Sequence, residues 1–478
     1  MYRRVAQAIA VDIRCGRLPA GTVLPGTRRL AQTLGIHRNT ALAAYRELAG
    51  EGFIDTRPGL GTFVVERQGT DEPTPLTAAR HRVPRTAPYR LRTPSGALIR
   101  RRPHPPGTLV LSHLPAPSEV PGVALARAYR GALRRRADDV LDYAQRYDSG
   151  APFGHPRLRR ALAQMLARTR GLMATAEDVL VTTGSQMALY LVALALVEPG
   201  DVIAVEGLGY RPVWEAFRFA GAVVVPVGVD REGLCVEELR ALTERTAVRA
   251  VYVTPHHQHP TGVTLTPPRR RALLELATAH DMAVIEDDYD CQFEYGGRTI
   301  RPLASIDPQG RVIYVGSLSK VLAPGLRIGY AVAPNSVLEL MAERRCFIDR
   351  QGDHALACAV AEMIENGELR RHIGRLHATY RSRRDALAEA LQSRLGGAID
   401  FDVPEGGTAV WARVDTGIDV DRWHARAIEH GVVFEPGSSF SLSPGASAHA
   451  RFGFAGLSVP QLQEAVRRLA LALASAEG

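Results

Sequence analysis

Short apolar runs rich in β-branched residues alternate with helix-like stretches through the middle of this chain. The apolar runs are VLVTTG, DVIAVE, AVYVTP, MAVIEDD and RVIYVGS, and stretches with helical periodicity lie at 157–169, 187–197 and 268–280. A strand that is apolar on both faces has to be covered by helices on both faces. The alternation therefore predicts an α/β body with a mostly parallel sheet.

The part of the chain past Asn335 has a different pattern. Long helical stretches rich in Arg and Ala lie at 336–350 and 353–394, and short strand-like runs follow near 409–414 and 450–454. This order predicts a smaller α+β subdomain at the C-terminal end of the body. With 478 residues, of which 46% are hydrophobic, the chain is long enough for two or three domains.

The first 66 residues have the pattern of a separate small unit. Helical periodicity covers about 2–15, 27–34 and 38–50, and Gly35 lies in the short turn between the second and third stretches. Two helices joined by such a turn predict a helix-turn-helix, although a small helical bundle with no DNA-binding function has the same pattern. Residues 57–64, which contain two glycines, predict a β-hairpin that would form a wing.

In a helix-turn-helix, residues at the N-terminus of the second helix enter the major groove. The residues expected to contact DNA are Arg28, Arg38, Asn39, Thr40 and, in the wing, Gly59 and Gly61. Gly26 and His37 stand at the helix starts, where a capping Ser or Thr is usual. We therefore expect these two helix ends to be poorly capped.

The net charge of +9 is distributed unevenly along the chain. Residues 1–107 carry 18 Arg and 7 acidic residues, a net charge of +11, whereas residues 108–478 carry 41 basic and 43 acidic residues, a net charge of −2. A basic unit attached to a neutral body is the distribution expected of a nucleic-acid-binding module. Residues 67–107, with eight prolines and nine arginines, predict an extended linker between a domain at 1–66 and a body at 108–478.

Only one of the 59 basic residues is a lysine, Lys320. All of the remaining 58 basic residues are Arg, so Lys320 marks a position whose chemistry a guanidinium cannot supply. Only the lysine amine can lose its proton and condense with an aldehyde. Ser317, Ser319 and Arg327 lie close to it in the sequence, and their hydroxyls and guanidinium suit a phosphate beside that amine.

Two more segments carry polar residues at predicted strand ends, which is where parallel sheets bind ligands. Gly184, Ser185 and Gln186 form a turn before a helix, and exposed N–H groups at a helix N-terminus favour a phosphate. The segment EDDYD, residues 286–290, is expected to follow the apolar strand directly. Its carboxylates suit either a metal ion or the pyridine nitrogen of a cofactor.

These segments, in this order, resemble the fold-type-I aminotransferases that bind pyridoxal 5′-phosphate (PLP). Residues 16–64 resemble the GntR-type winged helix. The whole chain is similar to the MocR-type transcriptional regulators, in which the two parts are joined. The fold expected from this resemblance is multidomain, with a winged helix-turn-helix and an α/β aminotransferase-like domain that carries the smaller C-terminal subdomain.

The resemblance also implies roles for individual residues. Lys320 would form the internal aldimine with PLP, Asp287 would pair with the pyridinium nitrogen, and Tyr289 would hydrogen-bond the ring hydroxyl. Tyr210 would stack on the ring, and Arg451 would hold an effector carboxylate. The phosphate would be held by Gly184, Ser185, Gln186, Ser317, Ser319 and Arg327.

Some positions depart from the family pattern. Residues 259–262 are His-Pro-Thr-Gly where aminotransferases have Asn-Pro-x-Gly, so the usual Asn contact to the ring hydroxyl is in doubt. Tyr147 is the candidate to reach the phosphate of a partner protomer, but the segment around it is longer than usual. His257 and His259 are expected to line the site rather than to bind a metal, because no further ligand spacing supports one.

The leading hypothesis is a PLP-dependent transcription factor that acts as a homodimer. It would bind double-stranded DNA at paired half-sites and sense PLP or a small amino compound through the body. The alternatives are a functioning aminotransferase that carries a DNA-binding domain and a cofactor-free dimerisation scaffold. Five cysteines without a C-x-x-C pair, and no apolar run long enough to cross a bilayer, predict a cytoplasmic protein with no membrane partner.

Overall fold

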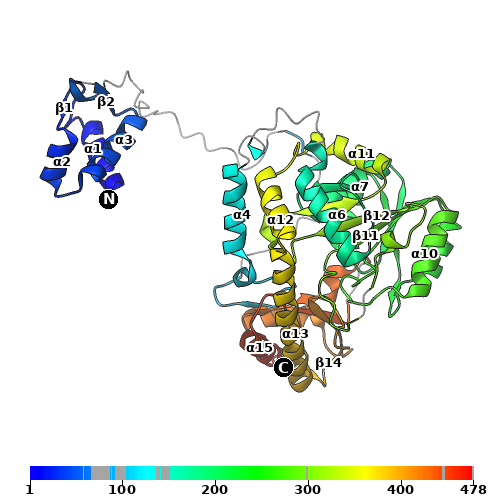
Figure 1. Ribbon diagram of the computed structural model, residues 1–478. Coiled ribbons are helices and arrows are strands. Elements are labelled where there is room, and N and C mark those ends of the chain that lie inside the picture. The colour runs from blue at the N-terminus through cyan, green and yellow to red at the C-terminus, as the bar shows by residue number, and fades with distance from the viewer. Residues whose placement is uncertain are drawn as a thin grey trace. The chain divides into compact units, whose positions relative to one another are not determined.

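The computed structural model describes residues 1–57, 59–65, 87, 89–91, 104–135, 140–141, 151–297, 300–443 and 447–475. The chain divides into two compact units, Met1–Leu98 and Ile99–Gly478 (Figure 1). Most of the predicted linker lies outside the described residues, as does Tyr147. None of the helices in the described ranges has the length and apolar character needed to span a membrane.

The N-terminal unit is a winged helix-turn-helix, as predicted. Its helices are α1 (Tyr2–Arg14), α2 (Thr27–Leu34) and α3 (Arg38–Gly50), and its strands are β1 (Val23–Leu24), β2 (Ile54–Arg57) and β3 (Gly61–Val64). The strands form an antiparallel sheet in the order β1-β3-β2. Gly35 ends α2 with a φ of 61°, a conformation that favours glycine.

The N-terminal ends of α2 and α3 differ in how they are capped. Gly26 gives α2 no side-chain cap, as expected. His37 does cap α3, because its Nδ1 accepts a hydrogen bond from the Asn39 N–H at 3.2 Å. The prediction of a poorly capped α3 is therefore wrong, since an imidazole nitrogen serves as the acceptor that a Ser or Thr oxygen usually provides.

The body is built on a seven-stranded sheet in the order β5-β13-β12-β11-β10-β6-β7. Its strands are β5 (Val179–Thr182), β6 (Val202–Glu206), β7 (Val223–Val227), β10 (Val248–Val253), β11 (Ala283–Asp288), β12 (Val312–Ser317) and β13 (Gly329–Val332). β13 is antiparallel to both of its neighbours, and all other pairs are parallel. The predicted mostly parallel sheet is confirmed.

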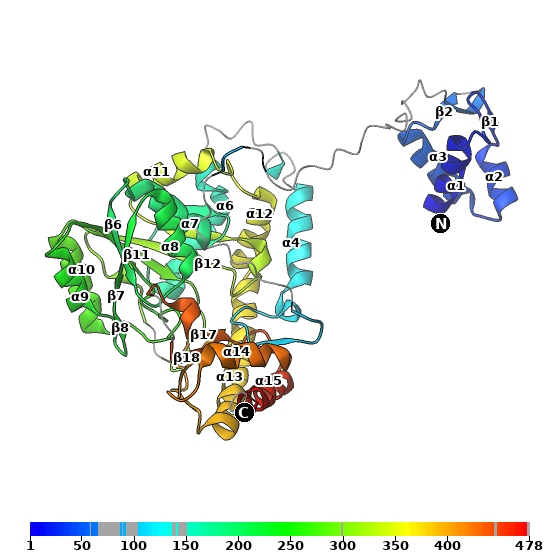
Figure 2. The same cartoon turned by 180° about the vertical axis from the view of Figure 1, so that it is seen from behind.

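Helices cover both faces of this sheet because its strands alternate between two apolar cores. Tyr252, Ile285 and Ile313 point to a core shared with α7 (Ser185–Leu196), α8 (Arg211–Ala220) and α11 (Asn335–Cys346). The neighbouring residues Val251, Val284 and Val312 point to the opposite core, with α9 (Val236–Thr243) and α10 (Pro267–Ala279) (Figure 2). A small hairpin of β8 (Val229–Asp230) and β9 (Gly233–Leu234) precedes α9.

The C-terminal subdomain has the predicted α+β character. Its antiparallel sheet follows the order β14-β15-β18-β17, with β14 (Ile399–Asp400), β15 (Ala409–Val414), β17 (Glu435–Pro436) and β18 (His449–Gly453). Figure 2 shows this sheet beside α14 (Val420–Glu429) and α15 (Val459–Ala474). The helix expected at 353–394 is two helices, α12 (His354–Glu365) and α13 (Glu368–Leu395), because Gly367 has a φ of 75° between them.

The first residues of the body belong to this C-terminal subdomain rather than to the large sheet. β4 (Leu109–Val110) pairs in parallel with β16 (Val432–Val433). Two helices, α4 (Gly122–Arg135) and α6 (Pro156–Arg170), then lead into the large sheet. This pairing positions His113, which follows β4, near the carboxyl ends of the strands of the large sheet.

Candidate cofactor and DNA sites

The predicted site residues of the body gather at one edge of the large sheet. β5 and β12 run in the same direction because both are antiparallel to β13, so their carboxyl ends lie at the same edge as those of β6 and β11. Gly184 follows β5, Tyr210 follows β6, Asp287 lies near the end of β11, and Lys320 follows β12. Sheets of this kind bind ligands at this edge.

Lys320 is a buried amine with a weakened hold on its proton. Its Nζ donates to the His113 backbone oxygen at 3.4 Å and lies 5.8 Å from the centroid of the Tyr289 ring. Burial lowers the pKa of Lys320 to about 7, and the charge of Arg451 adds to this effect while nearby carboxylates oppose it. A large share of the amine is therefore neutral near pH 7, and the neutral amine is the form that attacks an aldehyde.

Asp287 is a buried carboxylate that has one hydrogen-bond donor. Tyr252 Oη donates to its Oδ2 at 2.8 Å, whereas Oδ1 is buried and has no partner among the described residues. Burial raises the pKa of Asp287 to about 7, and Asp288 and Asp290 add to the rise. A buried acceptor without a donor fits the protonated ring nitrogen of PLP, which would supply both a donor and a positive charge.

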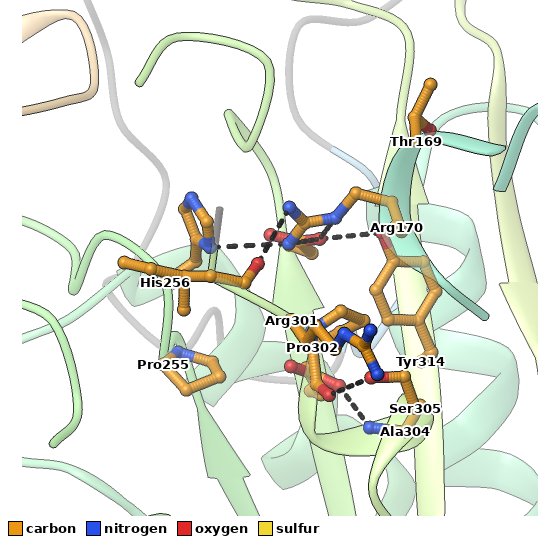
Figure 3. Close-up of polar contacts among 12 residues, drawn as sticks. Thr169, Arg170, Pro255, His256, Arg301, Pro302, Ala304, Ser305 and Tyr314 are labelled. Carbon is orange, nitrogen blue, oxygen red and sulfur yellow. Dashed lines mark hydrogen bonds and ion pairs between the residues drawn. The ribbon is translucent and has the colours of Figure 1, made fainter. Parts of the chain in front are cut away.

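Two other acids of the EDDYD segment, Glu286 and Asp288, are bonded to partners other than Lys320. β11 runs to Asp288, so Glu286, Asp287 and Asp288 lie within the strand and not after it as predicted. Asp288 Oδ2 accepts from Arg170 Nη2 and from Tyr314 Oη, both at 2.7 Å (Figure 3). The alternation of side chains along the strand therefore separates Asp287 from its two acidic neighbours.

One cluster of possible metal ligands lies beside these acids. His256, His257 and Glu294 place one ligand atom each within 4.8 Å of the others. His256 Nδ1 faces Arg170 Nη2 at 3.3 Å, so it has to accept, and its proton belongs on Nε2, the atom a metal would need. Burial alone would lower the pKa of His257, but Asp290 and Glu294 outweigh burial and raise it to about 9. These charges favour an ion-pair network, and the absence of a metal site stays a prediction.

The candidate phosphate cradle forms around the start of α7. Gly184 precedes the helix with a φ of 80°, and a Cβ on it would lie 2.6 Å from Nη2 of Arg327. Arg327 Nη2 donates to the Thr183 backbone oxygen at 3.3 Å, and Ser317 Oγ accepts from the Ser319 N–H at 3.1 Å. The helix N-terminus, Ser185 and Arg327 thus converge, as an anion site requires.

Gln186 is the exception among the predicted phosphate ligands. Its Nε2 donates to the Pro212 backbone oxygen at 3.1 Å, which directs the side chain toward the first turn of α8. Its Oε1 is buried without a donor among the described residues. The sequence of the turn does not predict this hydrogen bond, because Pro212 lies next to Gln186 only through the packing of α7 against α8.

His259 lies at the centre of an aromatic cluster. Its ring lies edge-on to Tyr210 at 5.8 Å, to Tyr289 at 5.7 Å and to Phe440 at 5.2 Å between centroids. Burial holds the pKa of His259 well below its ordinary value, so the ring is neutral. Its backbone N–H donates to Thr254 Oγ1 at 2.9 Å, which fixes the position where aminotransferases have Asn.

Arg451 is buried on β18, and its Nη1 already has two partners. It donates to His113 Nδ1 at 2.9 Å and to Glu435 Oε2 at 3.0 Å. Burial lowers the pKa of His113 to about 4, and the charges of Lys320 and Arg451 add to this. Sequence reasoning missed His113 and Glu435, because neither belongs to a motif and both reach Arg451 through strand pairing.

The predicted DNA-contacting residues lie in the N-terminal unit. Arg28 and Arg38 are exposed on α2 and α3, and neither makes a hydrogen bond or an ion pair with another described residue. Gly59 and Gly61 have φ values of 78° and 119° at the β2–β3 turn, where the Leu60 side chain is 71% exposed. Free guanidinium groups and a protruding hairpin tip are features of a DNA-binding surface.

Comparison with known proteins gives the class of each part. A family model for aminotransferase class I and II matches residues 130–469, and a model for the gntR family of bacterial regulatory proteins matches residues 1–64. LysN, an alpha-aminoadipate aminotransferase from Thermus thermophilus solved with N-(5'-phosphopyridoxyl)-L-leucine, matches with a TM-score of 0.71. It is 29% identical and covers 78% of this chain and 93% of that chain. The body is therefore a PLP-binding domain of the aminotransferase fold.

Two relatives match over nearly the whole length and contain both parts. The chain is 29% identical to the probable rhizopine catabolism regulatory protein MocR of Rhizobium meliloti, over 100% of this chain and 94% of that protein. It is 31% identical to the HTH-type transcriptional regulator TauR of Rhodobacter capsulatus, over 99% of this chain and 96% of that protein. The chain belongs to this family of GntR-type regulators joined to an aminotransferase-like domain, the MocR-type regulators.

Proposed function

We propose that this chain is a PLP-dependent DNA-binding transcriptional regulator whose body senses PLP or a small amino compound. The observation that carries the proposal is the pairing of a buried, readily deprotonated amine on Lys320 with the buried, incompletely bonded carboxylate of Asp287. Bound PLP would supply an aldehyde for the amine of Lys320 and a protonated ring nitrogen for the carboxylate of Asp287. We place the functional boundaries at 1–66, 67–107 and 108–478.

The residues around Lys320 would bind and orient the cofactor. Asp287 would fix the ring nitrogen, Tyr289 the ring hydroxyl, and Tyr210 the ring face. Gly184, Ser185 and Arg327 would hold the phosphate, with Ser317 and Ser319 beside them. These residues belong to several different elements, so a ligand bound there would contact all of these elements at once.

Regulation requires that the ligand contact two conformations of the body differently, because a ligand with equal affinity for both shifts nothing. The C-terminal subdomain meets the site through Arg451 and Glu435, while the large sheet contributes Lys320 and Asp287. A ligand that contacts both the C-terminal subdomain and the large sheet can therefore favour one conformation of the body over the other. In a homodimer, such a change would alter the spacing of two winged helices and with it the affinity for paired half-sites.

The test combines cofactor and DNA binding on the purified full chain. With PLP added, a visible absorbance band that borohydride makes permanent is expected, and the affinity for DNA from upstream of its own gene should differ between PLP-loaded and PLP-free protein. We propose that a regulator of this kind binds its operator in the cytoplasm. A band together with identical DNA affinities in the two forms contradicts the sensing of PLP itself, and identical affinities after addition of a primary amine that changes the band contradict the sensing of an amino compound.

The DNA-binding surface has its own test in Arg38→Ala. Loss of one phosphate or base contact should weaken operator binding by about tenfold and, for a phosphate contact, reduce the salt slope by about 1. Arg426→Ala, an exposed position on α14, is the matched control and should leave the affinity unchanged. An Arg38→Ala variant with the operator affinity of the unsubstituted protein would remove Arg38 from the DNA-binding surface.

A functioning aminotransferase is the second candidate, since aminotransferases match the body and Lys320, Asp287 and Arg451 are all present. We propose that the chain does not sustain turnover, because His259 replaces the expected Asn and because both full-length relatives described above are named as regulators. Continued transamination between two substrates would contradict this part of the proposal without affecting PLP binding.

A further inference from the structure

The arginine expected to clamp an effector carboxylate already holds a carboxylate from its own chain. Glu435 on β17 and Arg451 on β18 are direct cross-strand partners, and Glu435 Oε2 lies 3.0 Å from Arg451 Nη1. The same Nη1 donates to His113 Nδ1 at 2.9 Å. The strand register therefore fixes the pair, and no rotation of a surface side chain separates it.

In the charged Glu435–Arg451 pair, the arginine is buried and the glutamate is partly exposed. Arg451 is 2% exposed. Burial raises the pKa of Glu435, but the charge of Arg451 outweighs burial and holds the pKa of Glu435 well below its ordinary value. Both partners are thus ionised near pH 7, and together they carry no net charge.

The pair lies beside the reactive amine. The backbone oxygen of His113 accepts from Lys320 Nζ at 3.4 Å, while its side chain contacts Arg451. An amine that reaches PLP on Lys320 would therefore place its remaining atoms next to Glu435 and Arg451.

We propose that Glu435 determines specificity by pairing with Nη1 of Arg451 and neutralising its charge, so that the body prefers primary amines with an uncharged remainder over α-amino acids. This inference rests on the proposed function, because it concerns the amine that reaches bound PLP. A ligand carboxylate would either displace Glu435 and leave its partly buried carboxylate without a cation, or lie close to it as a second anion. An uncharged group meets neither penalty.

The remaining walls suit an apolar group. The Phe440 ring lies 5.8 Å from Arg451 Cζ and 5.9 Å from the Trp411 ring, and Trp411 is the cross-strand partner of Arg451 on β15. His259 contacts the other side of Phe440 and is neutral. The neighbours on this side of the Glu435–Arg451 pair are thus aromatic rings and a neutral imidazole, as in pockets for apolar ligands.

The experiment compares L-leucine with 3-methylbutylamine, which has the same carbon skeleton without the carboxylate. Both are titrated by calorimetry into PLP-loaded full-length protein, and the cofactor absorbance is recorded in parallel. In Glu435→Gln, where Arg451 is released, the ratio of the two dissociation constants should shift by at least about tenfold toward leucine. Glu429→Gln, which removes an exposed carboxylate on α14, should leave the ratio unchanged.

Two results would overturn the inference. One is a ratio in Glu435→Gln within about twofold of that in the unsubstituted protein. The other is a preference of the unsubstituted protein for leucine of more than about tenfold, which needs no variant and decides the question even if Glu435→Gln does not fold. A PLP-loaded protein without a visible band would contradict the proposed function instead, so the two failures are distinguishable.

Discussion

Two adjacent aspartates on opposite faces of β11, Asp287 and Asp288, differ in the partners that the chain gives them. Asp288 contacts Arg170 and Tyr314 on one face. On the other face Asp287 has the Tyr252 hydroxyl and contacts no cationic side chain among the described residues, and burial raises its pKa to about 7. Asp288 is thus paired with a cation from its own chain, whereas Asp287 has a single hydroxyl donor and no ion-pair partner among the described residues, which is the expected condition of a ligand-binding side.

The largest expected effect on the ligand-binding face comes from Lys320→Ala. No other side-chain amine exists in the chain, so the visible absorbance band and its trapping by borohydride should disappear completely. Circular dichroism should remain that of a folded protein, and the winged helix should still bind DNA. A band that persists in Lys320→Ala would show that Lys320 does not hold the cofactor.

The opposite face should respond through stability. Arg170→Met leaves Asp288 buried without its cation, and such a loss costs about 3–5 kcal/mol. The measurement is the urea transition of the body, and Arg426→Met, which breaks an exposed ion pair, should change stability by less than about 1 kcal/mol. If Arg170→Met keeps its stability but no longer binds PLP, Arg170 belongs to the ligand-binding face, and the proposed difference between the two faces of β11 is wrong.

Asp287→Asn should act on ligand binding. The variant loses the charged acceptor for the ring nitrogen, so PLP affinity should fall by roughly 10- to 100-fold. Asp288→Asn is the matched substitution on the other face, and it should lower the stability of the body while changing PLP affinity less. Equal losses of PLP affinity in the two variants would contradict a division of roles between the faces.

The raised pKa of Asp287 also predicts a pH dependence in the PLP-free protein. The folded state holds this proton up to about pH 7, whereas the unfolded chain releases it near the ordinary value of 3.8. Between these pH values the folded state binds more protons, so Asp287 makes stability fall as pH rises. Asp287→Asn should remove this part of the slope in urea transitions measured between pH 4 and pH 7, and an unchanged slope would contradict it.

Tyr252→Phe should have the smallest effect. It removes one hydrogen bond to Asp287, worth about 1 kcal/mol, and should therefore weaken PLP binding by only a few-fold. Tyr314→Phe, on the Asp288 side, is the control and should leave PLP affinity unchanged. A loss in Tyr252→Phe as large as that in Asp287→Asn would mean that the tyrosine itself contacts the cofactor.

Much of the fold was predictable because periodicity follows from local burial. Helices and strands whose apolar residues repeat at a fixed period, such as α2, α3 and the core strands of the body, fall where the sequence predicts them. The long C-terminal helix was predicted as one piece because its apolar pattern continues across Gly367, where the backbone adopts a positive φ. The position of the acids within β11 was also missed, since polar residues usually end an apolar strand.

The sequence by itself determined the two-part organisation, the position of the positive charge and the one side chain able to form an imine. Only the tertiary structure decided which of three adjacent acids faces Lys320, and that Gln186 turns toward α8. It also decided that Glu435 and His113 reach Arg451. The physical reason is that composition and periodicity record how each residue meets solvent and its near neighbours, whereas the partner of a buried charge is set by strand register and by packing between distant segments.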